Sequence, residues 1–195
     1  MNQDIAVIAR VRPAGGFSKM KNKIFAVSLV LGLMGFIGNA VAGENRPNMT
    51  QKPVSANLEK MKGLAGTWKG SSVKAGKEEP VTAEYSVTSG GSAVVEKLFA
   101  GTDHEMVSVY HDTKGKLSMT HYCMLGNQPV MDLKTSSPKE MQFEMKKKSG
   151  IDSRKETHMH ALRLSTPDEK TLVQDWTLYV NGKPAGVTTI KLTRI

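Results

Sequence analysis

Two short segments of this chain hold most of the side chains that could do chemistry. His121 and Cys123 stand two residues apart, and so do His158 and His160. Cys123 is the only cysteine, and these are three of the five histidines. Because side chains two positions apart on a β-strand point to the same face, each segment offers two donor groups to one side of a sheet. Imidazole and thiolate bind zinc and copper, and one imidazole can hold a haem iron.

Alternating patterns predict the strands that position these groups. Glu105–Asn127 contains two alternating runs around the turn Asp112–Gly115, which indicates an antiparallel hairpin. In the second run His121 and Cys123 alternate in phase with Leu117. Since leucine belongs on the core face of a strand, this phase directs the imidazole and the thiol into the interior.

The second segment has the same form. His158 and His160 alternate in phase with Leu162 and Leu164 over 157–165, so we expect both imidazoles to point inward as well. Two interpretations of the four groups stay open. They are either hydrogen-bonded histidines and a core cysteine with no resident cofactor, or ligands of zinc, copper or haem.

The rest of the chain predicts an all-β fold. Apolar residues at helical spacing over 54–64 indicate one short helix, which Gly63 ends. Ten alternating runs follow, with turn residues between them and no helical stretch. This pattern is typical of an up-and-down antiparallel barrel of roughly ten strands. The strands are expected at 65–72, 81–88, 92–99, 105–112, 116–124, 128–135, 140–146, 157–165, 171–180 and 187–194.

Several motifs resemble known barrel families. The run Gly66-Thr67-Trp68 after the helix, the stretch Trp176–Lys183 and the final Thr193-Arg194 look like the lipocalin, fatty-acid-binding-protein and nitrobindin group of calycin barrels. In that group the tryptophan closes one barrel end, often beside a late-strand arginine. The resemblance implies this structural role for Trp68 and Arg194.

A closer resemblance is to an uncharacterised family of exported bacterial proteins with a lipocalin-like barrel. Three runs carry it, and it covers roughly residues 58–195. Because such barrels host many functions, this resemblance speaks for the fold and leaves the function open. The three runs are Thr88–Glu96, His104–Val107 and Thr120–Cys123.

The N-terminal region has the layout of a secretory signal peptide. Lys21 and Lys23 precede the apolar run Ile24–Ile37, and the small residues Ala40-Val41-Ala42 follow it. We therefore predict a signal peptide at 20–42, a flexible leader at 43–53 and a lipocalin-like barrel domain at 54–195. Because Met20 stands directly before the basic residues, residues 1–19 are expected to be either a non-native extension from a mis-assigned start or an extended n-region of the signal. The mature protein is expected in the periplasm or secreted, with no stable membrane span.

Charge argues against a nucleic-acid partner. The formal charge of the whole chain is +9, but residues 1–42 contain five basic residues and one acidic residue, so the mature chain carries +5. The only basic run of the mature chain, Lys146–Lys148, leads into Ser149-Gly150, which is typical of a solvated loop.

The function that we predict from these features is the binding of a small apolar or amphipathic molecule in the barrel lumen, without catalysis. The alternative is a metal- or haem-binding barrel that uses His121, Cys123, His158 and His160. A third hypothesis is a rim acid–base pair at His104 and Glu105; the oligomeric state stays open. In the first case a few polar and aromatic side chains would orient the ligand, namely His121, Tyr122, His158, His160, Tyr110 and Trp176.

Overall fold

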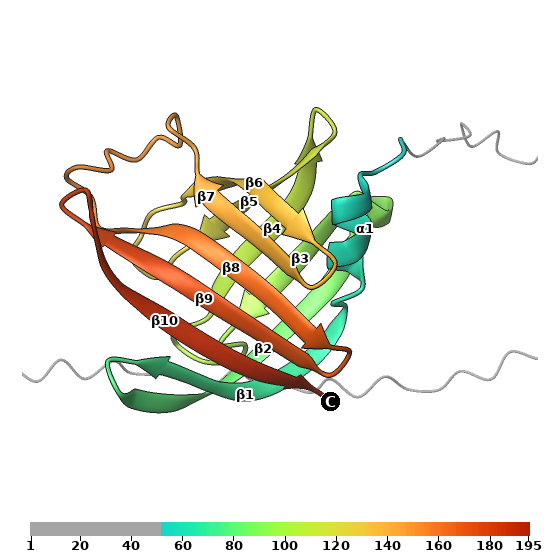
Figure 1. Ribbon diagram of the computed structural model, residues 1–195, viewed down its shortest axis with the longest axis horizontal. Helices are drawn as coiled ribbons and strands as arrows, with labels where there is room; N and C mark the ends of the chain where they lie inside the picture. Colours follow the sequence, from blue (N-terminus) through green and yellow to red (C-terminus); the bar gives the residue numbers. More distant parts are fainter. Residues whose placement is uncertain (1–51) are drawn as a thin grey trace, which may run out of the picture. The chain divides into compact units, whose positions relative to one another are not determined.

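Residues 52–195 are the part of the chain that the structure, a computed structural model, describes (Figure 1). The predicted extension at 1–19, the predicted signal peptide at 20–42 and nearly all of the predicted leader at 43–53 lie outside these residues. They stay predictions.

All ten predicted strands and the predicted helix are present, and the all-β barrel prediction is confirmed. The elements are α1 (Ala56–Lys62), β1 (Gly66–Lys74), β2 (Lys77–Thr88), the short 3-10 helix η1 (Ser89–Gly91), β3 (Ala93–Leu98), β4 (Met106–Thr113), β5 (Lys116–Tyr122), β6 (Val130–Ser137), β7 (Glu140–Met145), β8 (His158–Asp168), β9 (Thr171–Val180) and β10 (Lys183–Arg194).

The strands form one closed antiparallel barrel in which each strand pairs with its neighbours in sequence and β10 returns to β1. Closure removes the exposed edges that an open sheet would present to other chains. At the seam Gly70 is required, because a Cβ atom there would lie 1.8 Å from the carbonyl oxygen of Lys191 on β10. Thr166–Asp168, which the expected strand bounds left outside the strand, are instead the end of β8, where the pairing with β9 shifts register after Ser165.

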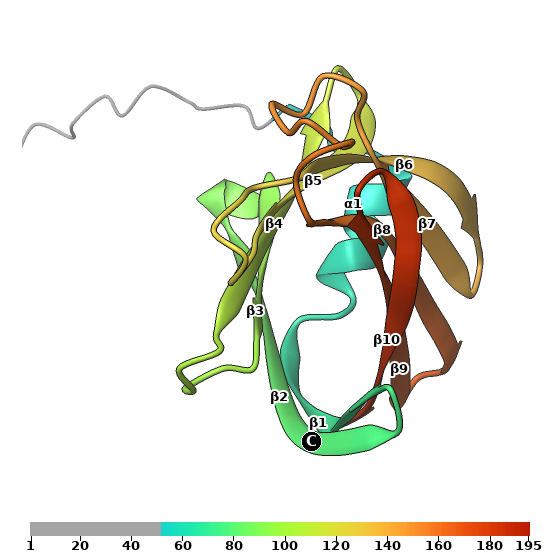
Figure 2. The same ribbon diagram turned by 90° about the vertical axis from the view of Figure 1, so that its left-hand side faces the viewer.

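Helix α1 closes one end of the barrel. In Figure 2, which looks along the barrel, the ring of strands surrounds the helix at the far end. The N-cap residue Ser55 accepts a hydrogen bond from the backbone of Leu58, and its own backbone and hydroxyl donate to Asp112 on β4. Leu58 and Met61 are fully buried, so the apolar face of α1 is the floor of the barrel.

Trp68 and Arg194, the pair that the resemblance singled out, lie in contact at this floor. The guanidinium carbon of Arg194 is 4.2 Å from the centre of the Trp68 ring, which is a cation–π geometry. The same guanidinium donates to the carbonyl oxygens of Gly63 and Ala65, just after α1, each at 2.7 Å. The indole NH of Trp68 donates to the carbonyl of Leu64 at 2.8 Å. The last strand thus holds the helix against the first strand.

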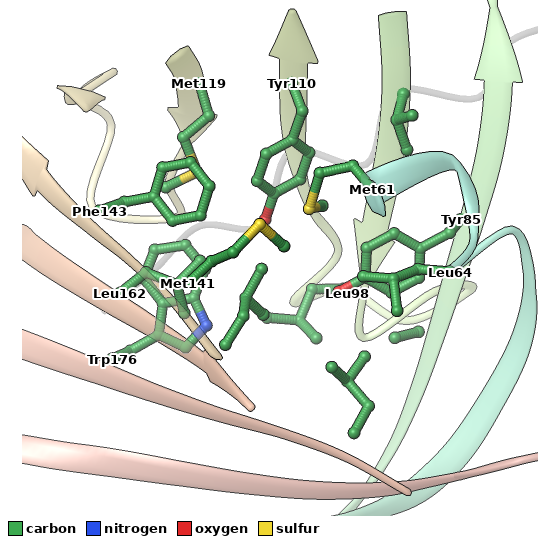
Figure 3. Packing of buried hydrophobic residues seen from close by; sticks show 14 of the residues in the cluster. Met61, Leu64, Tyr85, Leu98, Tyr110, Met119, Met141, Phe143, Leu162 and Trp176 are labelled. Carbon is green, nitrogen blue, oxygen red and sulfur yellow. The ribbon is translucent and has the colours of Figure 1, made fainter. Parts of the chain in front are cut away.

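Side chains fill the interior between this floor and the opposite end. Figure 3 shows Met61 from the floor side reaching toward Tyr110 and Tyr85, with Phe143 and Trp176 on the facing wall. A filled barrel of this kind is a packed core rather than an open channel.

The seven-residue helix α1 is too short to cross a bilayer, and nothing else in residues 52–195 forms a helix of the length and apolar character that a span needs.

Candidate functional site

A row of polar side chains crosses the barrel interior on four neighbouring strands. Strand pairing sets Tyr85 of β2 opposite Glu96 of β3, Glu96 opposite Ser108 of β4, and Ser108 opposite His121 of β5. All four are buried, and Glu96 is fully so. Residues paired across antiparallel strands lie side by side on one face, so the register alone places a phenol, a carboxylate, a hydroxyl and an imidazole in a line.

Glu96 is the centre of this row. Its carboxylate accepts hydrogen bonds from the hydroxyl of Tyr85 at 2.6 Å and from the hydroxyl of Tyr110 at 2.8 Å. The amide of Gln174, which reaches across from β9, donates to the same carboxylate at 2.6 Å and to the Tyr85 oxygen at 2.7 Å. The indole NH of Trp176 donates to the Gln174 carbonyl oxygen at 2.8 Å, which fixes the direction of that amide.

The carboxylate is surrounded by neutral donors. Among the ion pairs of residues 52–195 none involves Glu96. Burial raises the pKa of Glu96, while the hydrogen bonds from Tyr85, Tyr110, Gln174 and Ser108 act in the opposite direction. Burial and the nearby carboxylate raise the pKa of Tyr85 and Tyr110 well above the usual value, so both phenols stay protonated donors.

At the other end of the row lies His121. Its Nδ1 atom is 3.0 Å from the Ser108 hydroxyl, and its ring packs against Trp176 with ring centres 4.4 Å apart. Burial lowers the pKa of His121 to about 4, so the imidazole is neutral near pH 7. The prediction that His121 points inward agrees with its position here.

Beside His121 and Trp176 is a small cavity at the barrel end opposite α1. Its volume is about 40 Å³, enough for solvent but not for a porphyrin. Phe99 stands at its edge with a φ of 56°, a conformation that is rare and costly for a bulky residue. The walls are mostly apolar and consist of Leu98, Phe99, Met106, His121, Met159, Trp176, Thr188 and Ile190.

The prediction that His158 and His160 point inward is wrong. Strand pairing sets His158 opposite Tyr179 and Met159 opposite Leu178, and then resumes with Ala161, so His160 is an extra residue in a β-bulge. A bulge reverses the alternation, because two residues of one strand oppose one of its partner. It is therefore Met159 that lines the interior cavity. His160 stacks on Tyr179 in the outer groove, and His158, although fully buried, packs against His160 and Tyr179 and not against the cavity.

On this face of β8 the buried His158 and the partly buried His160 form a hydrogen-bonded pair of imidazoles. Nδ1 of His158 lies 2.7 Å from the carbonyl oxygen of Glu156, so it carries the proton, and Nε2 of His158 accepts from Nδ1 of His160 at 3.1 Å. The His160 ring stacks on Tyr179 at 3.8 Å, and its Nε2 lies 3.9 Å from Glu144. Burial and the neighbouring His158 lower the pKa of His160, against the influence of Glu144. His160 lines an open groove of about 590 Å³ on β7, β8 and β9.

The four groups predicted as metal ligands do not converge. His121 faces the interior cavity, His160 lines the outer groove, and the buried His158 is paired with His160 and lines neither. Cys123 is buried just beyond β5 with a free thiol whose pKa is raised by burial. Within the described part of the chain no three histidine, cysteine or acidic side chains gather as a metal site would require.

The remaining predicted residues fall in different places. Tyr110 and Trp176 are inside the barrel and belong to the Glu96 network, whereas Tyr122 is 51% exposed on the outside. His104 and Glu105 lie in the exposed β3–β4 loop, where Glu105 accepts a hydrogen bond from the backbone of Gly101. This contact gives the rim carboxylate a structural role.

Sequence reasoning missed the centre of the site. Glu96 stands between Val94 and Leu98 on the apolar face of β3, and Gln174 stands between Leu172 and Trp176 in the same way on β9. The alternation used for the histidines would have found a carboxylate and an amide on core faces. A buried charged group without an ion pair is rare enough to mark a position of special importance.

Tyr110→Phe should weaken the fold by removing one donor from the buried carboxylate while keeping the ring. We expect a loss of about 1–3 kcal/mol in the free energy of unfolding at pH 7, measured by urea titration. The matched control is Tyr122→Phe, whose hydroxyl belongs to an exposed residue and whose loss should change stability little. Equal effects of the two substitutions would contradict the assigned network.

Protonation of His121 should destabilise the barrel in acid. Because the folded pKa of about 4 lies below the ordinary value of 6.5, the unfolded chain binds the proton first as the pH falls. The contribution of His121 to the free energy of unfolding is complete above pH 6.5. As the pH falls from 6.5 to 4, this contribution decreases by about 3 kcal/mol.

The measurement is the difference in unfolding free energy between the natural chain and His121→Asn at several pH values. Glu96, whose raised pKa makes stability fall as the pH rises, contributes to both chains and cancels in this difference. His111→Asn, on the outer face of β4, is the control that should keep the full pH dependence. A pH-independent difference would rule out the buried neutral imidazole.

Comparisons with known proteins support the barrel fold and give no function. No known family description matches this sequence, and no curated protein is significantly similar to it. Among solved structures, the barrel is similar to a protein of unknown function from the DUF3598 family of Nostoc punctiforme, with a TM-score of 0.51 and 11% sequence identity. The match covers 69% of this chain and 49% of that chain, so this chain spans about half the length of its structural neighbour.

Proposed function

We propose that this chain is an exported, calycin-like barrel that binds a small apolar or amphipathic molecule at the end opposite α1. The observation that carries the proposal is the cavity beside His121 and Trp176, which lies at the end of the barrel opposite α1. Its walls are apolar apart from one imidazole and one threonine hydroxyl, a composition typical of small-molecule sites.

The cavity must widen to admit a ligand. Sites for drug-sized molecules measure about 300–1,000 Å³, far above the 40 Å³ found here. Phe99 and Met159 are the apolar wall residues that are only partly buried, so they can move at the lowest cost. Phe99 also holds an unfavourable backbone conformation, and methionine side chains adapt readily to irregular shapes. We therefore assign the entrance to Phe99 and Met159.

Two side chains, His121 and Trp176, would orient the ligand. The neutral imidazole of His121 offers its Nε2 atom, because Nδ1 is engaged with Ser108. Trp176 offers a ring face and has its NH committed to Gln174. Through Gln174 and Ser108 both residues are tied to Glu96, so the buried network holds them in place before the ligand arrives. His158, His160 and Tyr122 have no part in this site.

The proposal of a calycin relationship rests on three features. These are the up-and-down order of the strands, the helix across one end and the contact between Trp68 and Arg194. The proposal of export rests on the sequence alone, namely the basic, apolar and small-residue succession before Gly43.

Met159→Ala should increase the uptake of a small apolar fluorescent probe such as Nile red. The substitution removes a flexible wall residue and enlarges the cavity where it opens to solvent. We expect at least a severalfold lower dissociation constant in a fluorescence titration. Met131→Ala is the matched control, because Met131 is fully buried on β6 and its loss leaves a closed void. Both variants are first checked for cooperative unfolding.

Three results would decide against the binding site. The first is that neither the natural chain nor Met159→Ala takes up Nile red, and the second is that Met159→Ala and Met131→Ala increase the affinity for Nile red equally. The third is that uptake of Nile red persists unchanged when His121→Trp fills the cavity.

Export predicts that the mature protein begins at Gly43. Expression in a bacterial host, followed by fractionation and intact-mass measurement, should give a chain of residues 43–195 outside the cytoplasm. Replacing Ala40 and Ala42 by bulky residues should leave the precursor uncut, because the cleavage site needs small side chains. A cytoplasmic chain that retains residues 20–42 would refute the proposal.

A further inference from the structure

The β5–β6 loop exposes apolar side chains at a position where most turns are polar. Cys123–Gly126 form a tight turn closed by the backbone hydrogen bond from Gly126 to Cys123 at 2.9 Å, and Cys123 itself donates to Asn127 at 3.1 Å. The two central residues are Met124 and Leu125, which are 61% and 45% exposed. Such central positions favour glycine, proline, asparagine, aspartate and serine. With the exposed Tyr122 just before them, they form a small apolar tip.

The loop beside this tip is strongly basic. The β7–β8 loop, residues 146–157, carries five basic side chains against two carboxylates, a net charge of +3. It is tied to the tip at both ends: the backbone of Lys146 donates to Val130, and the Asn127 amide donates to Thr157. Lys147, Lys148 and Arg154 are exposed and form no ion pair with another described residue.

The apolar tip and the basic loop occupy one side of the barrel end opposite α1. Figure 1 shows the β7–β8 loop beside the β9–β10 turn at this end, and Gly182 of that turn lies against Arg154. The turn is followed by Lys183, a further exposed cation. On the other side of the tip comes the β3–β4 loop, with the acidic residues Asp103 and Glu105. Charge is therefore divided across the rim.

We infer that this side of the rim is a docking surface for an anionic lipid bilayer. The docking surface consists of Tyr122, Met124, Leu125, Lys147, Lys148 and Arg154. The inference goes beyond the proposed function and rests on it only in naming the bilayer as the source of the ligand.

Two physical contributions add at such a surface. Exposed apolar side chains gain by entering the boundary between headgroups and acyl chains, where an aromatic ring is also favoured. Lysine and arginine next to them are attracted by the negative surface potential of anionic lipids, an attraction that falls off within a Debye length. With so few residues neither the apolar contribution nor the electrostatic one is large. Binding to the bilayer is therefore reversible and requires both contributions. The cavity opens at the same end as the docking surface.

The test is co-sedimentation with vesicles of phosphatidylglycerol and phosphatidylcholine, compared with vesicles of phosphatidylcholine alone. The protein is the chain 43–195, which contains every element of the closed barrel and lacks the apolar run 24–37, a lipid-binding segment in its own right. We expect binding to the anionic vesicles at low salt and at least a tenfold weaker partition, in order of magnitude, to the neutral ones.

Matched variants separate the two contributions. Lys147→Glu with Lys148→Glu, and Met124→Ser with Leu125→Ser, should each lower binding about tenfold or more. Lys69→Glu with Lys191→Glu makes the same charge change on exposed β1 and β10 positions, and Val87→Ser removes an exposed apolar residue near the helix end. Both controls should bind like the natural chain.

The outcomes distinguish this inference from the proposed function. Loss of vesicle binding in the two rim variants, with Nile red uptake retained in the absence of vesicles, supports the docking surface. Equal binding to neutral and anionic vesicles overturns it, and so does equal loss in rim and control variants. Absence of Nile red uptake with vesicle binding intact would refute the cavity and leave the docking surface standing.

Discussion

The structure depends on one buried carboxylate. Glu96 lies at the middle of a closed barrel where water cannot solvate its charge, and no cation pairs with it among the described residues. Desolvation of this kind is tolerated only when hydrogen-bond donors replace the lost water. The barrel supplies them from β2, β4 and β9, so the hydrogen bonds of Tyr85, Tyr110 and Gln174 link opposite walls. The polar network thereby specifies which strands face one another, which an apolar core alone would leave less defined.

This arrangement explains how a packed interior and a binding role fit together. The end near α1 is closed by apolar contacts and by Arg194, while the other end holds the small cavity, a strained Phe99 and partly buried side chains. The rigid end near α1 and the adaptable cavity end thus lie at opposite ends of the barrel axis. The Glu96 network lies between them, because His121 and Trp176 belong to both the network and the cavity wall.

The strands were predicted well because alternation of apolar and polar residues depends only on which side chains face the core. All ten alternating runs are strands of the barrel. The same alternation agrees with the buried position of His121, which contacts Trp176 inside the barrel. It failed at His158 and His160, because a single inserted residue in β8 reverses the phase and a bulge has no clear composition signal. Glu96 was overlooked although its phase is plain between Val94 and Leu98. Two of its donors lie on the neighbouring strands β2 and β4, but Gln174 comes from the distant strand β9, which no local pattern can join to β3.

Closure of the barrel between β1 and β10 has a consequence for how the chain is made. The seam pairs Trp68 with Arg194, so β1 gains its second neighbour only after β2 to β10 have all been made. Until synthesis or translocation delivers β10, any partly folded sheet carries two open edges that can pair with other chains. A C-terminal truncation of a few residues would act on the same step, since it removes both the edge partner of β1 and the cation that retains α1. Strand β10 is therefore the element whose arrival closes the barrel.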